Sequence, residues 1–585
     1  MRKSKKRKGS RGSQNSRSFR RDQETTPKQS ASSDSALEQR AVSDKDNDWR
    51  WYAQNETLLK AYGSFPFGVA LGVQPQTGIT TVDEGAVPGI MALNFTPLVG
   101  VADSPNSPIN VASRNIYSYV RHANSGHANY DAPDLMLYLV AMDSALMYYA
   151  YLRRLIGVQN LYLQQNRYTP PVLTKAMGVD FNDLQKHLVD IRGYANQYAV
   201  KLGAMAIPNS MSYMARHQWM CDNIYVDSQM SSKAQWYMYT PDAFYKFSRN
   251  SETQAGQLTL TESISTRIRE GRNYLLFDDL VELGNLLIDP ILQEEDMNIM
   301  AGDILKAFGD SGVYKLYAIP EGYTVIPSYS QEVLSQIENA ICGNGVIISG
   351  DVTQRTGVDE GYLTSNPFVS YITKWASKTS CPSGDCTIGS NSWGFRNIIE
   401  PVFNGNKIIN FHWSEPSAAD VMVATRLTPA FRLSKTDDWS VHVSSGYVQY
   451  YVPLKAVGSE IINACVIWSF KGQTREAVST QIGYFQAYGI PGRDGGDNMT
   501  VLDEMSTMTS LLSCFDWHPA VMFGAVGFGV GASPVYDDIR GMCGFEMDID
   551  NYTFLTGDNL LNLHTTALLS EFTVPMMGAA SMSGI

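Results

Sequence analysis

The pattern of apolar and polar positions divides the chain into four regions. Residues 1–48 are rich in Ser, Gln, Asp, Lys and Arg, so they cannot bury enough apolar surface to offset the entropy lost on ordering. Apolar residues at helical spacing dominate residues 49–310, and they return in residues 455–585. Residues 311–454 instead carry short β-prone runs between Gly, Ser, Thr and Pro. We therefore expect an α+β protein, predominantly α-helical, with a disordered arm, a helical domain in two parts and a strand-rich domain inserted between them.

The longest apolar run, residues 135–156, predicts a long helix. Pro133 suits its first turn, Asp131 can cap its start and Gly157 can end it. Asp143 lies near the middle of the run, where a charge would cost about 2.5 to 3.5 kcal/mol in a bilayer. We therefore expect this helix to be buried in protein, and we expect no stable membrane insertion.

Further periodic runs predict several shorter elements. Leu184, Leu188 and Ile191 are spaced by four and three and follow Asn182, a candidate helix cap. The other predicted helices cover residues 275–287, 297–308, 501–512 and 559–569. The clearest predicted strands cover residues 407–412 and 439–452.

Charge is distributed very unevenly along the chain. The formal net charge is -12, yet residues 1–21 hold ten basic residues and no acidic one. The remaining 36 basic and 58 acidic residues give the rest of the chain a net charge of -22. The predicted nucleic-acid-binding residues are these ten: Arg2, Lys3, Lys5, Lys6, Arg7, Lys8, Arg11, Arg17, Arg20 and Arg21. The body should repel nucleic acid and the arm should attract it.

Two other roles for the basic arm stay open at this point. The cluster of residues 5–8 is also typical of a nuclear-import signal, and a basic tail can simply be a solvated segment. No apolar run follows the basic residues, so we expect no secretory signal. The seven Cys are scattered and odd in number, which favours a reducing compartment over a disulfide framework.

The familiar catalytic signatures are missing from the sequence. It contains no phosphate-binding loop with its Lys, no His-Glu-x-x-His helix and no Gly-x-Ser-x-Gly elbow. Gly527, Gly529 and Ala532 loosely match a dinucleotide-binding pattern, but Ser533 and Pro534 follow where a helix should run. We interpret this segment as a loop or a site of tight packing.

Three small groups of residues have weak chemical potential. Cys381 and Cys386 form a single pair, which is poor evidence for zinc. His122 and His127 lie near Asp131 and Asp134, at a spacing that matches no rigid metal geometry. The acidic residues Asp278, Asp279 and Glu282 lie where carboxylates complement a helix dipole. We expect Cys381 and Cys386 to be solvent-exposed loop thiols and the other two groups to have structural roles, with no metal, no cofactor and no enzyme activity, although an enzyme with a nonstandard site stays an alternative.

Several segments closely resemble the capsid proteins of picobirnaviruses. They are PGIM (88–91), SPINV (107–111), NIYSYVRHANSG (115–126), APDLM (132–136), MGVDF (177–181), RHQWM (216–220) and GDILK (302–306). The resemblance covers roughly residues 49–310 and is weak beyond them. A cellular RNA-binding or nucleolar protein with a basic tail is the alternative that does not rest on this resemblance.

The resemblance implies a structural protein of the virion. It implies homodimers that build an icosahedral shell around double-stranded RNA, with a shell domain (residues 49–310 and 455–585) and a projecting domain (residues 311–454). The viral RNA polymerase is a further partner under this hypothesis, and assembly would take place in the host-cell cytoplasm. Related capsid proteins can lose an N-terminal segment by self-cleavage beside an Asn, for which Asn47 and Asn55 are the candidates here. Residues 22–48 lack the amphipathic stripe of a membrane-active peptide.

Overall fold

The structure is a computed structural model in which the chain forms two units, Met1–Gly68 and Val69–Ile585. The residues that it describes are 49–64, 89–126, 130–162, 169–228, 234–249, 255–264, 267–269, 271–342, 347–355, 361–374, 407–431, 440–444, 447–471, 476–482, 485–489, 511–526 and 542–574. The predicted helix at 501–512 therefore lies almost entirely outside the described residues. Each unit is considered by itself.

The described part of the first unit is a short helical segment. A 3-10 turn, η1 (Trp49–Trp51), precedes helix α2 (Glu56–Gly63). The side chain of Asn55 caps α2 by accepting a hydrogen bond of 3.1 Å from the Leu58 backbone N–H. None of the α2 side chains is buried.

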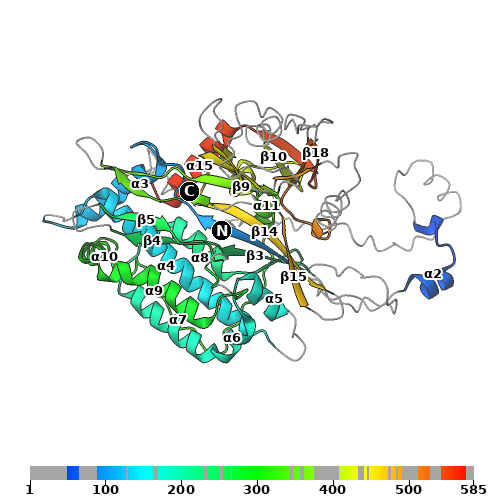
Figure 1. Ribbon diagram of the computed structural model, residues 1–585, viewed down its shortest axis with the longest axis horizontal. Helices are drawn as coiled ribbons and strands as arrows, with labels where there is room; N and C mark the ends of the chain where they lie inside the picture. Colours follow the sequence, from blue (N-terminus) through cyan, green and yellow to red (C-terminus); the bar gives the residue numbers. More distant parts are fainter. Residues whose placement is uncertain are drawn as a thin grey trace, which may run out of the picture. The chain divides into compact units, whose positions relative to one another are not determined.

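The second unit contains a bundle of helices around one long central helix, α4 (Ala132–Gln159), shown in Figure 1. The helices that contact it are α3 (Pro108–Ala123), α5 (Thr169–Ala176), α6 (Phe181–Lys186), α7 (Leu188–Gly203), α8 (Ser212–Asp222), α9 (Phe277–Gln293) and α10 (Glu295–Phe308). Three more helices follow in the sequence: α11 (Gln331–Glu338), α13 (Ala418–Ala424) and α15 (Gly557–Glu571). The predicted helices at 275–287, 297–308 and 559–569 are confirmed.

Helix α4 is the core of the bundle, as its all-round apolar sequence predicts. It is long and apolar enough to cross a membrane, but that stretch is completely buried inside the protein. Asp131 caps its start and forms a capping box with Asp134, as expected from the sequence. The expectation for Gly157 is wrong, because α4 runs past it to Gln159. A Cβ at this position would lie 2.9 Å from the Val325 backbone nitrogen, so the glycine allows a neighbouring segment to approach closely.

Two arginines near the end of α4 explain how charge is tolerated in the core. Arg154 is fully buried, and it donates hydrogen bonds of 3.2 and 3.1 Å to the backbone oxygens of Met220 and Asn223. These carbonyls lie at the C-terminal end of α8, where a cation also complements the helix dipole. Arg153, the neighbouring residue on α4, forms an ion pair with Asp222, the last residue of α8. Its Nε lies 2.8 Å from the Asp222 carboxylate. The arginines therefore fix α8 against α4.

The prediction of one helix around residues 184–191 needs correction. The structure has two helices there, α6 and α7, which meet at His187. Asp180, rather than Asn182, caps α6 by accepting a hydrogen bond of 2.8 Å from the Asp183 backbone N–H. Leu184 of α6 and Ile191 of α7 are both buried, so the apolar spacing continues from one helix into the next. Periodicity alone therefore does not show that the helix is interrupted at His187.

The central sheet joins distant parts of the sequence. Its order is β15 (Glu476–Ile482), β14 (Glu460–Lys471), β1 (Ile90–Pro97), β3 (Trp236–Pro241) and β2 (Tyr225–Val226). Strand β1 pairs antiparallel with β14 and parallel with β3. Its residues are almost all buried, so both faces of this strand are covered by the rest of the protein. The sequence pattern does not predict β1, β2 and β3, because apolar residues at helical spacing dominate residues 49–310.

The remaining described strands form a second five-stranded sheet and four smaller sheets. One has the order β11 (Ala430–Phe431), β13 (Tyr447–Ala456), β9 (Phe368–Lys374) and β6 (Ile347–Ser349), with β12 (Ser440–Ser444) also paired to β13. A three-stranded sheet has the order β16 (Phe485–Gly489), β17 (Val521–Val526) and β18 (Met542–Glu546). The two-stranded sheets are formed by β4 (Tyr245–Ser248) with β5 (Gln257–Leu260), by β7 (Thr353–Arg355) with β8 (Tyr362–Thr364), and by β10 (Lys407–Phe411) with β19 (Asn551–Leu555).

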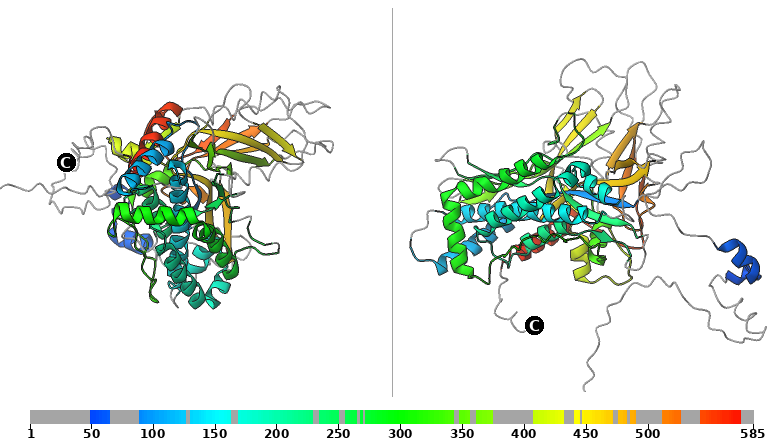
Figure 2. Two further views of the ribbon diagram at one scale, coloured as in Figure 1. Left: turned by 90° about the vertical axis from the view of Figure 1, so that its left-hand side faces the viewer. Right: turned by 90° about the horizontal axis from the view of Figure 1, so that it is seen from below.

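The two predicted strands are both present, and the second is split. The run at 407–412 is β10, whereas the run at 439–452 forms β12 and the first part of β13, which pair antiparallel. Figure 2 shows helices gathered on one side of this unit and most of the later strands on the other. The fold is therefore α+β, while the domain boundaries at residues 310 and 454 stay a prediction.

Candidate functional sites in the core and on the surface

The residues predicted to bind nucleic acid lie outside the described residues, so their role stays a prediction. The same holds for Cys381, Cys386, His127 and the loop at 527–532. His122 is exposed near the end of α3, and Asp131 and Asp134 serve the start of α4. Within the described ranges, no group of three or more His, Cys, Asp or Glu side chains could hold a metal ion.

The predicted acidic cluster at the start of α9 is matched by arginines. Asp279 accepts a hydrogen bond of 2.9 Å from the Leu276 backbone N–H and forms ion pairs of 3.1 Å with both Arg269 and Arg272. Glu282 pairs with Arg269 at 3.0 Å, while Asp278 points outward and is exposed. The carboxylates stabilise the helix start, as expected from the sequence.

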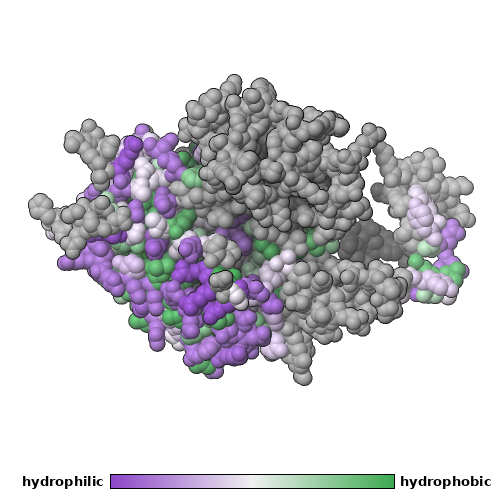
Figure 3. Space-filling view, in the orientation of Figure 1, coloured by the Kyte–Doolittle hydropathy of each residue, from purple (hydrophilic) through white to green (hydrophobic). Residues whose placement is uncertain are grey.

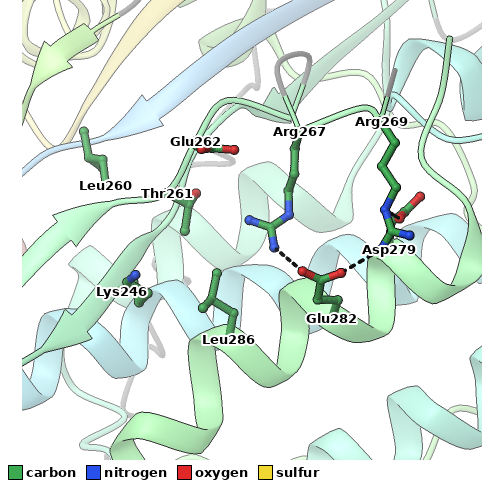
Figure 4. A pocket seen from close by; sticks show the side chains of 9 residues that line it. All are labelled: Lys246, Leu260, Thr261, Glu262, Arg267, Arg269, Asp279, Glu282 and Leu286. Atoms are coloured by element: carbon green, nitrogen blue, oxygen red, sulfur yellow. Dashed lines mark hydrogen bonds and ion pairs between the residues drawn. The ribbon is translucent and has the colours of Figure 1, made fainter. Parts of the chain in front are cut away.

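Asp279 and Glu282 also line a hollow of about 380 Å³, shown in Figure 4. Its other charged lining residues are Lys246, Glu262, Arg267 and Arg269. Because three acidic and three basic side chains face one another, the hollow has no strong preference for an anion or a cation. Paired-carboxylate catalysis needs two adjacent carboxylates that compete for a proton, and here arginines lie between them.

The most concentrated charge in the core centres on His217 of α8. Its Nδ1 lies 2.7 Å from Asp143 of α4, and its Nε2 lies 3.1 Å from the Ser459 backbone oxygen and 3.8 Å from Glu460 of β14. Burial lowers the pKa of His217, but the two carboxylates outweigh this effect and raise the pKa above its usual value. Arg216 completes the group by donating a hydrogen bond of 2.8 Å to Glu460.

This group extends to the last helix, α15. His564 of α15 is fully buried, and its Nε2 lies 2.9 Å from the Thr428 backbone oxygen. Its Nδ1 has no hydrogen-bond partner among the described residues and lies 3.1 Å from the position of a Cβ at Gly458. Burial and the nearby charge of Arg426 lower the pKa of His564 to about 3. The imidazole is therefore neutral at pH 7, and protonation would be strongly opposed.

The buried charge cluster (Asp143, Arg216, His217, Arg426, Glu460, His564 and Glu571) joins five parts of the fold: α4, α8, the turn after α13 (Ala418–Ala424), β14 and α15. An Asp–His pair next to a serine resembles hydrolytic machinery. However, His217 and Asp143 are completely buried, and the ring faces the Ser459 backbone oxygen instead of its hydroxyl. A general base must reach the proton it removes. The cluster can therefore hold elements together but cannot meet a substrate.

A third histidine joins another set of elements. His412, just after β10, lies 3.1 Å from Glu338 at the end of α11 and 2.7 Å from Asp550, which precedes β19. Its ring also contacts Trp517 edge to face, with 4.1 Å between ring centroids. Burial lowers the pKa of His412, but the two carboxylates outweigh it and raise the pKa to about 9. At neutral pH the histidine is a cation between two anions.

Sequence reasoning found one member of the buried charge cluster and missed the others. Asp143 stood out as a charge within an apolar run, and Arg216 and His217 lie in a segment that carries the family resemblance. Their partner Glu460 is more than 200 positions away, and no local pattern connects it to them. A charged residue within the apolar sequence of a buried helix indicates that a residue of opposite charge lies next to it, but it does not identify that residue.

Comparisons with known proteins agree with one another. The family model described as Picobirnavirus, Capsid protein matches residues 51–490. The capsid protein precursor of Human picobirnavirus is 30% identical over 544 residues, covering 91% of this chain and 92% of that protein. The solved structure titled "X-ray crystallographic structure of the picobirnavirus capsid" has a TM-score of 0.69 at 21% identity, covering 92% of this chain and 100% of that one.

The first two matches each span most of the chain, and the third shows the same fold. They favour a structural, non-enzymatic role in a virion over a cellular RNA-binding protein or an enzyme. The chain belongs to the picobirnavirus capsid protein family.

Proposed function

We propose that this protein assembles as symmetric dimers into an icosahedral shell and packages double-stranded RNA through its basic arm. As a capsid protein it is part of the virion and associates with copies of itself. The observation that carries the RNA proposal is the segregation of charge: ten cations in residues 1–21 against a net charge of -22 in the remainder. A negatively charged wall with cationic tethers holds a polyanion only through the tethers.

The arm is long enough for this task. A flexible chain of 48 residues spans roughly 40 Å, from about 5 to 6 Å times the square root of its length. Such a tether reaches from a shell wall to the RNA behind it. Each phosphate contact releases counterions, so binding should weaken steeply with salt and depend little on base sequence.

The division into shell and projecting domains is part of the same proposal. The shell domain would comprise residues 49–310 and 455–585, and the projecting domain residues 311–454. Pairing of β1 with β14 supports the shell assignment, because it unites strands from both predicted parts in one sheet. Assembly in the host cytoplasm, with the viral polymerase as a further partner, belongs to the proposal as well.

Replacing the ten basic residues within residues 1–21 by glutamine tests the RNA proposal while keeping the arm's length. We expect particles to form with less RNA, because the tethers have lost their charge. The RNA content of purified particles is measured by the ratio of absorbance at 260 and 280 nm. As a matched control, ten Ser and Gln residues of the arm are exchanged with one another, which should leave the RNA content unchanged. Equal RNA content in the glutamine variant and the unaltered protein would contradict the proposal.

N-terminal self-cleavage beside Asn47 or Asn55 is a further part of the proposal. The Human picobirnavirus relative is named as a precursor, which supports processing. The side-chain oxygen of Asn55 is engaged with the Leu58 backbone N–H, 3.1 Å away. Intact mass of subunits from mature particles decides: loss of the first 47 or 55 residues would support this step, and full-length subunits would remove it.

A further inference from the structure

The two edges of the central sheet differ in how they end. At one edge lies β2, which is only two residues long and whose outer side is occupied. The Val226 N–H donates a hydrogen bond of 3.0 Å to the Ser328 backbone oxygen, and the Ser328 N–H donates one of 3.0 Å to the Ile224 backbone oxygen. At the other edge lies β15, which is seven residues long (Figure 1). Among the described strands, β14 alone pairs with β15, so within the described residues this edge of the sheet is open.

An open strand edge is a binding surface for another strand. In an antiparallel pair, about half of the residues direct their N–H and C=O groups to the neighbouring strand, so the others direct theirs outward. Those groups must bond to water or to another backbone. Natural proteins usually protect such an edge with Lys, Pro, a β-bulge or a very short strand. Strand β15 has none of these devices: its sequence, EAVSTQI, contains no Lys and no Pro, and its register with β14 is unbroken.

The composition of β15 suits contact with a second copy of this chain. The body of the protein is strongly acidic, so two copies can meet only where acidic residues are few. Glu476, at the start of β15, is its only charged residue. Val478, Thr480 and Ile482 are β-branched, which favours paired strands.

The kind of contact also fits the described surface. On the face drawn in Figure 3 the second unit is mostly hydrophilic, with apolar residues in small patches. That face provides no broad apolar area through which copies could associate. Strand pairing needs no such area, because main-chain hydrogen bonds supply the affinity.

Two copies that join through their central sheets must use the same edge. As a capsid protein the chain associates with copies of itself. The β2 edge is occupied by Ser328, so β15 of one copy cannot extend the central sheet of another copy through β2. The remaining arrangement is β15 against β15. Identical surfaces that meet are related by a two-fold axis, and such an axis makes the paired strands antiparallel.

We propose that β15 pairs antiparallel with β15 of a second copy, so that the two central sheets become one continuous sheet. The inference rests on the proposed function, because it identifies a contact of the symmetric dimer. The two-fold axis passes through Ser479, the middle residue of β15, which is exposed in the single chain. Position 479 therefore lies opposite itself. Glu476 of each copy lies opposite Ile482 of the other, so no acidic residue faces another.

Charge at the two-fold axis tests the proposal. Ser479→Lys places two cations opposite one another and Ser479→Glu places two anions there, so each variant alone should associate about tenfold or more weakly than the unaltered protein. An equal mixture of the two variants should restore association, because opposite charges then meet across the axis. Analytical ultracentrifugation measures the association. As matched controls, Ser118→Lys and Ser118→Glu on the exposed side of α3 should associate like the unaltered protein, alone and mixed.

A crosslink tests the geometry directly. Residues directly opposite one another in an antiparallel pair have Cα atoms about 4.5 or 5.5 Å apart, and a disulfide can bridge either distance. Under mild oxidation, Ser479→Cys should form disulfide-linked dimers above the level of the unaltered protein, and Ser118→Cys should not.

Several outcomes would overturn the proposal. They are normal association of the two charge variants, no restoration in their mixture, and capture of a different protein by Ser479→Cys. A lower melting temperature of both charge variants with unchanged association would also overturn it, because another segment of the same chain would then cover the edge. Failure of the unaltered protein to form particles would instead overturn the proposed shell function, so the two failures are distinguishable.

Discussion

Replacement of His564 by glutamine tests whether the last helix is an acid-sensitive element. His564 attaches α15 to the Thr428 backbone oxygen, and its other ring nitrogen has no hydrogen-bond partner in the described part of the chain. Protonation would place an unpaired donor and a positive charge in the core close to Arg426. A glutamine amide can donate the same hydrogen bond and does not titrate in this range.

The size of the effect follows from the two pKa values. In the unfolded chain the pKa of His564 is 6.5, and in the folded protein it is lowered to about 3. A folded pKa below the unfolded one means that the stability contribution is complete above pH 6.5 and is lost as pH falls towards 3. At pH 5 the loss is about 2 kcal/mol, which corresponds to a roughly 30-fold increase in the opening equilibrium.

Hydrogen exchange of the α15 amides at pH 5 and pH 8, corrected for intrinsic exchange, measures this opening. Between pH 8 and pH 5 the unaltered protein should lose about 2 kcal/mol more protection than His564→Gln. The pKa of His217 is raised, so its effect has the opposite sign, but it is present in both proteins and cancels in the comparison. If both proteins lose the same protection between the two pH values, the reasoning is refuted.

Two further predictions concern packing and alkaline pH. Gly284→Ala should destabilise the protein by about 1 to 3 kcal/mol, because the new Cβ would lie 2.7 Å from the ring of Tyr148. Gly302→Ala, where a Cβ meets nothing within 4 Å, should be neutral or stabilising; denaturant unfolding compares the two, and equal effects would contradict the packing argument. The contribution of His412 is complete below pH 6.5 and is lost as pH rises through about 9, so His412→Gln should remove that part of the alkaline loss of stability. Unfolding at pH 6 and pH 9.5 checks this, and an identical loss in both proteins would exclude the role of His412.

The sequence pattern predicts α4, α9 and α10 because each of them buries a continuous apolar side, whereas α3, α5 and α8 are not among the predicted helices. Helix α4 shows this most clearly, since its run, its cap at Asp131 and its burial all follow from local residues. Its end does not. Glycine is common at helix ends, but the small size of Gly157 instead allows a segment more than 150 positions away to pack against α4. Tertiary packing overrides the local signal.

The candidate sites are harder to predict for the same reason. His217, Glu460 and His564 lie together only because α8, β14 and α15 converge. No spacing in the sequence relates them, and the only hint is a charged residue within an apolar run.

The central sheet also sets an order of events during synthesis. Strands β1 and β14 are separated by roughly 370 residues of chain, and β1 lies between β14 and β3 in the sheet. At about 5 to 20 residues per second, a ribosome makes β14 some tens of seconds after β1. During that interval the helices around α4 are available, but one edge of β1 has no neighbour. A half-made subunit consequently cannot complete its central sheet, and a chain that stops before β14 lacks the pairing that joins its early and late parts.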